Sequence, residues 1–362
     1  METRLSGCSG CLLGIAIGDA MGSVIDKKTW EEICENYGPN GLLGYDLQSD
    51  YAEITSYTQL AAFAANGLLV NAARGQGDAY LRYLTTGIRE WAKSQYFLTT
   101  GERTACWLAQ IPLMRRRVSM DTRMTDYLTR ETLGTPENPV NTAQGPGGIT
   151  AALPVGLFYD PERLTLTQVA ELGASAVAMI HGAPDAFLAG GVAAVAVALM
   201  QEDPGKQPDI HFRKAIQIVR ERYQDRWPEE MAALEALLEK AITLSDDPEI
   251  TPLVAMTILG CTTAAECLAG SIYACCVHVG NFDEALITAV NHSGRSGAVG
   301  ALTGGFMGLK MGAEELPDFY LESLEVTNIL QELSKDTAQR RQFSRIFDDD
   351  WDQKYIQGMP IR

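Results

Sequence analysis

The chain has few basic residues for its size. Lysine and arginine number 29 against 46 aspartates and glutamates among 362 residues, so the formal net charge is −17 at pH 7. Such a charge repels the phosphate backbone of a nucleic acid unless cations gather on one face. The only dense basic run is Arg115-Arg116-Arg117, which a solvated helix end or loop explains better. We therefore expect no nucleic-acid partner.

Long hydrophobic runs are also missing. The longest, from Ala186 to Met200, contains Gly190 and Gly191. It is shorter than the ~18 residues that a membrane span needs, which predicts a buried helix. Leu5-Ser6-Gly7-Cys8 resembles a lipoprotein cleavage box, but too few residues precede it to hold a charged and then an apolar signal region. These features predict a cytoplasmic protein without a membrane partner.

The cysteines do not form a disulfide or zinc pattern. Several of the eight lie in apolar stretches, where a cysteine packs as a small hydrophobic residue, so disulfides are not expected. Cys8 and Cys11 have the spacing of half a zinc site, yet no second Cys/His pair stands at zinc spacing. Helix packing is the favoured interpretation of this pair.

Strict alternation of apolar and polar residues is almost absent. Apolar residues instead recur at spacings of three and four, which is typical of helices. The fold class is predicted to be all-α: a single compact multi-helix bundle over residues 1–345 with an acidic tail over 346–362. We expect the tail to be solvated, with docking of a partner as the alternative. Pro228 and the capping box Thr165-x-x-Gln168 mark two helix starts. Further helices are expected near residues 54–70, 78–93, 121–132, 148–158, 165–180, 185–200, 212–223, 263–279, 282–291, 298–311 and 317–334.

Four stretches marked by glycine interrupt these segments. Glycine lets the backbone approach a ligand closely, and N–H groups at a helix start favour anions, although ordinary turns between helices explain most glycines too. None of the stretches is a dinucleotide fingerprint or a phosphate loop. They are Gly14-x-x-x-Gly18-Asp19-Ala20-Met21-Gly22, Asn141-Thr142-Ala143-Gln144-Gly145-Pro146-Gly147-Gly148, His181-Gly182-Ala183-Pro184 and Asn291-His292-Ser293-Gly294-Arg295-Ser296-Gly297.

In this order, the stretches resemble the ADP-ribosylglycohydrolase family of all-helical enzymes. The resemblance spans nearly the whole chain, and its most specific matches are the first and the last. The matches are Gly10-Cys11-Leu12-Leu13-Gly14-Ile15-Ala16-Ile17-Gly18-Asp19-Ala20-Met21-Gly22, Thr58-Gln59, Asn66-Gly67-Leu68-Leu69, Gly147-Gly148 with Pro154-Val155-Gly156-Leu157-Phe158, His181-Gly182 and Asn291-His292-Ser293-Gly294. The resemblance implies cleavage of the glycosidic bond between ADP-ribose and a protein side chain or small acceptor, with two Mg²⁺ or Mn²⁺ ions as cofactors.

The segments that hold these ions in the family are altered here. By resemblance, aspartates would stand at Ser56 and Tyr57, next to Thr58, and again at Arg295 and Gly297. Two dications need several carboxylates to offset their repulsion, whereas this chain loses four negative charges and gains one positive charge at these positions. At an effective dielectric of ~20, one like-charge contact at ~4 Å costs about 4 kcal/mol. We therefore expect no metal cofactor.

The resemblance also implies ligand-binding residues. Asp26 stands where many members carry a glutamate near the catalytic centre, Asp19 would lie in the floor of the cleft, and His181 would contact a ribose. The loop that cradles the diphosphate would contain Gly145, Gly147 and Gly148. Arg295 would replace a metal by pairing with Asp19 or Asp26, or would bind a phosphate or carboxylate of the ligand. The alternatives are a core histidine at position 181 and a solvated arginine at position 295.

Three hypotheses account for these residues. The favoured one is a metal-free pseudoenzyme that binds ADP-ribose, a related nucleotide or an ADP-ribosylated protein without hydrolysis, because both metal segments are altered within a well-preserved scaffold. The second is an active hydrolase with one metal or none, in which Asp26 is the general base, worth ~10²–10⁴-fold, and Arg295 stabilises negative charge. The third is a structural or interaction protein with a vestigial cleft.

Overall fold

The computed structural model describes residues 2–96, 103–118, 123–339 and 349–360, and these are helical without any strand. The all-α prediction is confirmed. The helices are α1 (Glu2–Ser23), α2 (Trp30–Tyr37), α3 (Ser56–Ala73), α4 (Tyr80–Tyr96), η1 (Trp107–Gln110), α5 (Arg123–Thr129), η2 (Ile149–Ala152), α6 (Leu153–Leu157), α7 (Leu166–Ala178), α8 (Pro184–Glu202), α9 (Pro208–Tyr223), α10 (Pro228–Ser245), α11 (Pro252–Leu259), α12 (Ala264–Val277), α13 (Phe282–Val290), α14 (Ser296–Met311), η3 (Ala313–Glu315), α15 (Asp318–Ser323), α16 (Thr327–Gln339) and α17 (Asp349–Tyr355).

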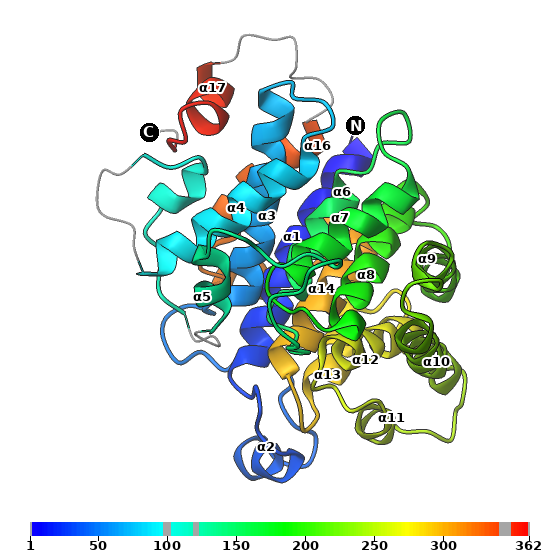
Figure 1. Ribbon diagram of the computed structural model, residues 1–362. Helices are drawn as coiled ribbons and strands as arrows, with labels where there is room; N and C mark the ends of the chain where they lie inside the picture. The colour runs from blue at the N-terminus through cyan, green and yellow to red at the C-terminus, as the bar shows by residue number, and fades with distance from the viewer. Residues whose placement is uncertain (1, 97–102, 119–122, 340–348, 361–362) are drawn as a thin grey trace.

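Two antiparallel helices, α1 and α14, form the centre of the molecule, with α3 and α4 on one side and α7 to α10 on the other (Figure 1). Glycines let this pair approach closely. A Cβ at Gly14 would lie 2.0 Å from the carbonyl oxygen of Gly304, and one at Gly18 would lie 1.9 Å from that of Gly300. The first glycine-marked stretch therefore does not interrupt a helix, as the sequence suggested. It is the interior of α1, and its glycines serve helix packing.

This packing decides which helix ends meet. A Cβ at Gly22, in the last turn of α1, would lie 2.3 Å from the carbonyl oxygen of Ser296, the first residue of α14. Asp19 in the same turn binds the backbone N–H groups of Thr55 and Thr58 at the start of α3. The N-termini of α3 and α14 therefore converge at the C-terminal end of α1.

Most predicted helices lie where the sequence places them, and both predicted starts, the Thr165 capping box and Pro228, are present. The predicted helix over 317–334 is two helices, because Leu324 between them pairs with Ala52 in an isolated bridge. The predicted helix over 148–158 is η2 followed by α6. The helices α1, α2, α11 and α17 lie outside the predicted ranges. Residues 121 and 122 of another predicted helix lie outside the described residues.

Two helices, α1 and α8, are long and apolar enough to cross a membrane. Within the structure they are core helices: 83% of the apolar window of α1 and 78% of that of α8 are buried. Helix packing accounts for this apolar surface, since core helices of globular proteins are apolar all round. The absence of a membrane partner stays a prediction.

The acidic tail is not a solvated segment where the structure describes it. Trp351 and Tyr355 of α17 are buried, and Lys354 is 4% exposed. Lys354 pairs with Asp336 of α16, and the Tyr355 hydroxyl donates to the same carboxylate at 2.6 Å. The expectation of a solvated tail is therefore wrong for α17, because its apolar and paired side chains pack onto the helical body.

Candidate functional site

A cavity of about 430 Å³ opens where the end of α1 meets the starts of α3 and α14. It brings together most of the site residues that the sequence predicts: Asp26, Ser56, Tyr57, Gly145, Gly147, His181, Arg295 and Gly297. The rest of the lining is Pro146, which lies within the predicted glycine loop, and Ser23, Lys27, Thr55 and Met124, which were not predicted as site residues. Asp19, Thr58 and Gly148 are not part of the lining. We call this cavity the cleft.

Asp19 lies behind the wall of the cleft. Its carboxylate is fully buried and accepts four hydrogen bonds of 2.6 to 3.1 Å, from the N–H and hydroxyl groups of Thr55 and Thr58. Burial raises the pKa of Asp19 to about 6, and the four hydrogen bonds oppose this shift. Asp19 therefore holds the start of α3 in place, while its predicted contact with a ligand has no support in this geometry.

Arg295 connects Asp26 and Tyr57 across the cleft wall. Its Nε donates to Oδ2 of Asp26 at 3.2 Å, and one terminal nitrogen donates to the Tyr57 hydroxyl at 3.0 Å. The other oxygen of Asp26 accepts the backbone N–H of Gly297 at 3.2 Å. Of the two partners that the sequence offers, Arg295 thus takes Asp26, and both oxygens of Asp26 are engaged. The side chains of Arg295 and Asp26 are only 29% and 18% exposed.

The ring of Tyr57 fills the space beside Gly297. A Cβ at Gly297 would lie 3.3 Å from Cε2 of Tyr57, so a larger side chain there would press on the ring. Burial holds the pKa of Tyr57 well above its usual value, and the side chain is a neutral phenol. The substitutions at these positions therefore fit one another as a set.

These residues do not fit a pair of metal ions. Magnesium needs hard, anionic oxygen ligands, and the positions offer a serine, a neutral phenol, a guanidinium and a glycine. Across the described ranges, no group of three or more His, Cys, Asp or Glu side chains is placed to hold a metal ion. Cys8 and Cys11 are buried on α1, where burial raises the pKa of the Cys8 thiol to about 11.

The glycine loop packs around the ring of His181. A Cβ at Gly145 would lie 3.2 Å from Cε1 of the imidazole, and one at Gly147 would lie 3.2 Å from Nε2 and 2.5 Å from Sδ of Met124. Gly148 lies behind, against Ile180 and the ring. Close packing on His181 thus requires small residues here. No described residue accepts a hydrogen bond from the N–H groups of these glycines, so they remain as donors at the start of η2.

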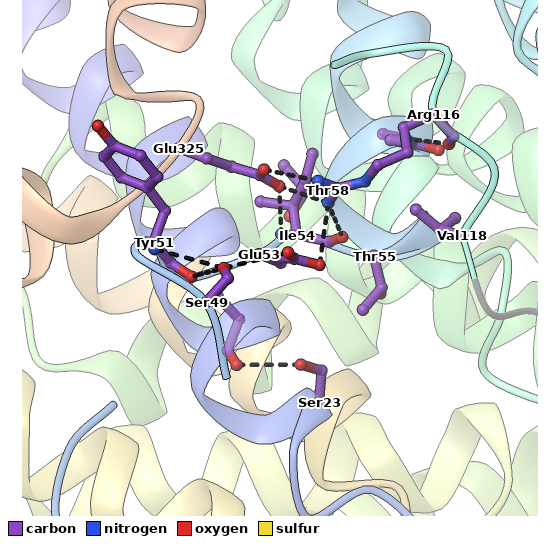
Figure 2. Close-up of polar contacts among 12 residues, drawn as sticks. Ser23, Ser49, Tyr51, Glu53, Ile54, Thr55, Thr58, Arg116, Val118 and Glu325 are labelled. Carbon is purple, nitrogen blue, oxygen red and sulfur yellow. Dashed lines mark hydrogen bonds and ion pairs between the residues drawn. The ribbon is translucent and has the colours of Figure 1, made fainter. Parts of the chain in front are cut away.

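A partly buried ion pair holds the segment that leads into α3. The two terminal nitrogens of Arg116 donate to the two oxygens of Glu325 at 2.7 and 2.6 Å, and Glu325 also accepts the N–H of Ile54 at 2.9 Å. Figure 2 shows Arg116 reaching toward Glu325 beside Ile54, with Glu53 close by. Sequence reasoning missed this pair because its members stand 209 residues apart and match no motif. They place Thr55 and Ser56 at the cleft.

The charge of the cleft is opposite to that of the whole chain. Its charged lining residues are Asp26, Lys27 and Arg295, two cations and one anion in a chain of net charge −17. Lys27 has a φ of 66°, a left-handed conformation that is uncommon outside glycine and clusters at functional sites. Its N–H donates to the carbonyl of Gly294 at 2.8 Å, which fixes this conformation beside Arg295.

Comparison with known proteins agrees with the fold and the motifs. Residues 1–346 match the profile of the family described as ADP-ribosylglycohydrolase. Among solved structures, the chain is similar to one described as an ADP-ribosylglycohydrolase-related protein complex, with a TM-score of 0.58 and 20% identity over 95% of this chain and 100% of that chain. At this identity the likeness shows the fold alone. A search of curated proteins finds no match.

Proposed function

Because the chain belongs to the ADP-ribosylglycohydrolase family, we propose that its cleft binds ADP-ribose or a related nucleotide, free or attached to a protein, without metal ions and without cleaving it. The observation that carries this proposal is the position of Arg295. By resemblance, this residue takes the position of a metal-binding aspartate, and its guanidinium is held by Asp26 and Tyr57. A fixed cation at this place opposes the entry of a dication.

The hydrogen bonds of Asp26 support a role as an anchor. A general base needs an oxygen within hydrogen-bond reach of the water that it deprotonates. One oxygen of Asp26 accepts from Arg295 and the other from the backbone of Gly297. The carboxylate thus acts as an anchor for Arg295 and for the start of α14. Each oxygen keeps a further acceptor site, so Asp26 is the group on which the active-hydrolase alternative depends.

The other half of the cleft supports binding. The N–H groups of Gly145 and Gly147 have no acceptor among the described residues, and oriented N–H groups at a helix start favour phosphate. His181 lies against the same loop and lines the cleft. A ligand of the ADP-ribose type would place its diphosphate on the loop and a ribose beside His181. A cytoplasmic location, with no nucleic-acid or membrane partner, remains part of this proposal.

A paired assay tests the proposal. The purified chain at high concentration is incubated with ADP-ribosylated arginine and serine substrates, with Mg²⁺ or with EDTA, and released ADP-ribose is measured. Thermal unfolding with ADP-ribose is recorded in parallel. We expect no release and a rise of the melting temperature that EDTA leaves unchanged. Release of ADP-ribose that is lost in Asp26→Ala would establish the active hydrolase instead. No release together with an unchanged melting temperature would favour a vestigial cleft.

A further inference from the structure

We propose that the half of the cleft formed by Ser56, Tyr57 and Arg295 is an anion-binding subsite, which takes an oxyanion such as a phosphate or carboxylate group. Metal cations are expected at the equivalent place in the family, so the subsite has the reverse preference. This inference adds a subsite to the proposed function. It rests on the proposed function only for the nucleotide part of the ligand. Four observations support it.

The first is the unused hydrogen-bonding capacity of Arg295. A guanidinium carries five N–H groups, and the structure uses one for Asp26 and one for Tyr57, which leaves three. The side chain lines the cleft, so these N–H groups can reach a ligand there. A guanidinium whose orientation is already fixed loses little freedom on binding and can hold two oxygens of a phosphate or carboxylate at once.

The second observation is the start of α3. Ser56 is 5% exposed and lines the cleft, and within the described parts of the chain neither its hydroxyl nor its N–H has a hydrogen-bond partner. The neighbouring N–H groups do have acceptors: those of Thr55 and Thr58 donate to Asp19. Ser56 therefore offers two free donors at the positive end of an 18-residue helix.

The third observation is the Tyr57 hydroxyl, which accepts a hydrogen bond from Arg295. Because burial keeps the side chain a neutral phenol, it retains its proton. That proton has no acceptor among the described residues and can be donated to a ligand. A phenol polarised by a neighbouring cation is a strong donor to an anion.

The fourth observation is the charge around the subsite. Lys27 and Arg295 contribute two positive charges and Asp26 one negative charge. The start of α14 lies at the same place, and its dipole adds to that of α3. The buried carboxylate of Asp19 adds a second negative charge at the start of α3, so the four formal charges cancel. The region is therefore close to neutral within an acidic chain, and the unused donors of Ser56, Tyr57 and Arg295 favour an anion there.

The subsite is separate from the glycine loop, although both line one cleft. The loop offers backbone N–H groups, whereas the subsite offers side chains of α3 and of the residue before α14. A ligand that used both would carry an anionic group in addition to the diphosphate, at the end of the molecule that approaches Arg295. An ADP-ribose derivative with a phosphate or carboxylate on its terminal ribose has this chemistry.

The test uses the full chain and inorganic phosphate as the probe. Unfolding temperature and calorimetric heat are measured at constant ionic strength for wild type, Arg295→Gln, Ser56→Asp and the control Arg213→Gln. Arg213 carries the same charge but is exposed on α9, where it pairs with Glu239. Ser56→Asp guards against a folding defect in Arg295→Gln, because an acidic residue suits the start of a helix. Sulfate and acetate serve as further probes, which separate a phosphate site from a carboxylate site.

We expect phosphate or acetate to bind wild type and Arg213→Gln, with Kd raised at least tenfold in the other two variants. An equal effect in all four proteins would mean a general salt effect and would overturn the subsite. If no anion binds while ADP-ribose does, the subsite fails and the proposed function stands. If an anion binds as expected while ADP-ribose does not, the subsite stands and the proposed function fails.

Discussion

The two halves of the cleft differ in how many of the family's motif residues they keep. The half with the glycine loop and His181 keeps the residues that the motifs predict, because each added Cβ would collide with the imidazole or with Met124. The other half carries Ser56, Tyr57, Arg295 and Gly297 at positions where, by resemblance, the family has aspartates, and two helix starts meet the end of α1 there. We propose that these side chains replace a site for cations by a site for anions.

Restoring the acidic residues should have the largest effect, because it would return the altered half of the cleft to the family's pattern. We expect the variant Ser56→Asp, Tyr57→Asp, Arg295→Asp, Gly297→Asp to unfold at a lower temperature in EDTA, because its carboxylates repel one another, and to be stabilised by Mg²⁺. A metal bound at 1,000 times its Kd adds about 4 kcal/mol. Wild type should not respond to Mg²⁺ in the same thermal assay.

The matched control carries four asparagines at these positions, which have the same shape without the charge. Stabilisation of the asparagine variant or of wild type by low-millimolar Mg²⁺ would contradict our account of the altered half.

The buried carboxylate of Asp19 holds the start of α3 and does not line the cleft. Its effect should therefore be on stability. Its folded-state pKa of about 6 lies above the ~3.9 of an unfolded chain. Between these values the folded state binds more protons, so this group lowers the free energy of unfolding as pH rises from about 4 to 6, by up to about 3 kcal/mol.

Chemical denaturation of wild type and Asp19→Asn across pH 4–7 isolates this contribution. We expect wild type to lose stability relative to the variant as pH rises through the window. A difference that runs the other way would mean that the hydrogen bonds from Thr55 and Thr58 outweigh burial.

Arg295→Gln should affect both stability and binding. The change leaves Asp26 without its ion pair and the Tyr57 hydroxyl without its donor, and we expect a loss of about 1–3 kcal/mol in the free energy of unfolding, the usual range for a charged hydrogen bond. Arg295→Lys, which keeps the charge but not the planar fork, should recover part of the stability. If Arg295→Gln were as stable as wild type by denaturant titration, the contacts of Arg295 with Asp26 and Tyr57 would not stabilise the cleft.

A substitution in the glycine loop should lower the stability less than Arg295→Gln does. Gly147→Ala places a methyl group 2.5 Å from Sδ of Met124, the flexible end of a side chain, so we expect a loss of about 1–2 kcal/mol from overpacking together with weaker ADP-ribose binding. Gly44→Ala is the control, because nothing lies within 4 Å of a Cβ there. Equal stability of the two variants in thermal unfolding would refute the packing of this loop on His181.

The spacing of apolar residues predicted the helical fold, whereas the resemblance to a family predicted most of the cleft residues. Both failed where a residue's role depends on a distant partner. The glycines from Gly14 to Gly22 suggested a turn between helices or a close approach to a ligand, yet close packing against the backbone of α14 explains them. Asp19 belongs to a family motif and was expected at the ligand, but its carboxylate accepts hydrogen bonds from Thr55 and Thr58. The basic run that contains Arg116 suggested a solvated loop, and its pairing with Glu325 gave no signal because only the folded chain brings the two together.

The most direct test of the account is calorimetric titration of the full chain with ADP-ribose, first in Mg²⁺ and then in EDTA. Because we propose that Arg295, held by Asp26 and Tyr57, takes the place of the metal ions, we predict binding with the same Kd in both conditions and no slow heat from hydrolysis. Binding that requires Mg²⁺, or disappears in EDTA, would contradict the claim that this cleft works without metal ions.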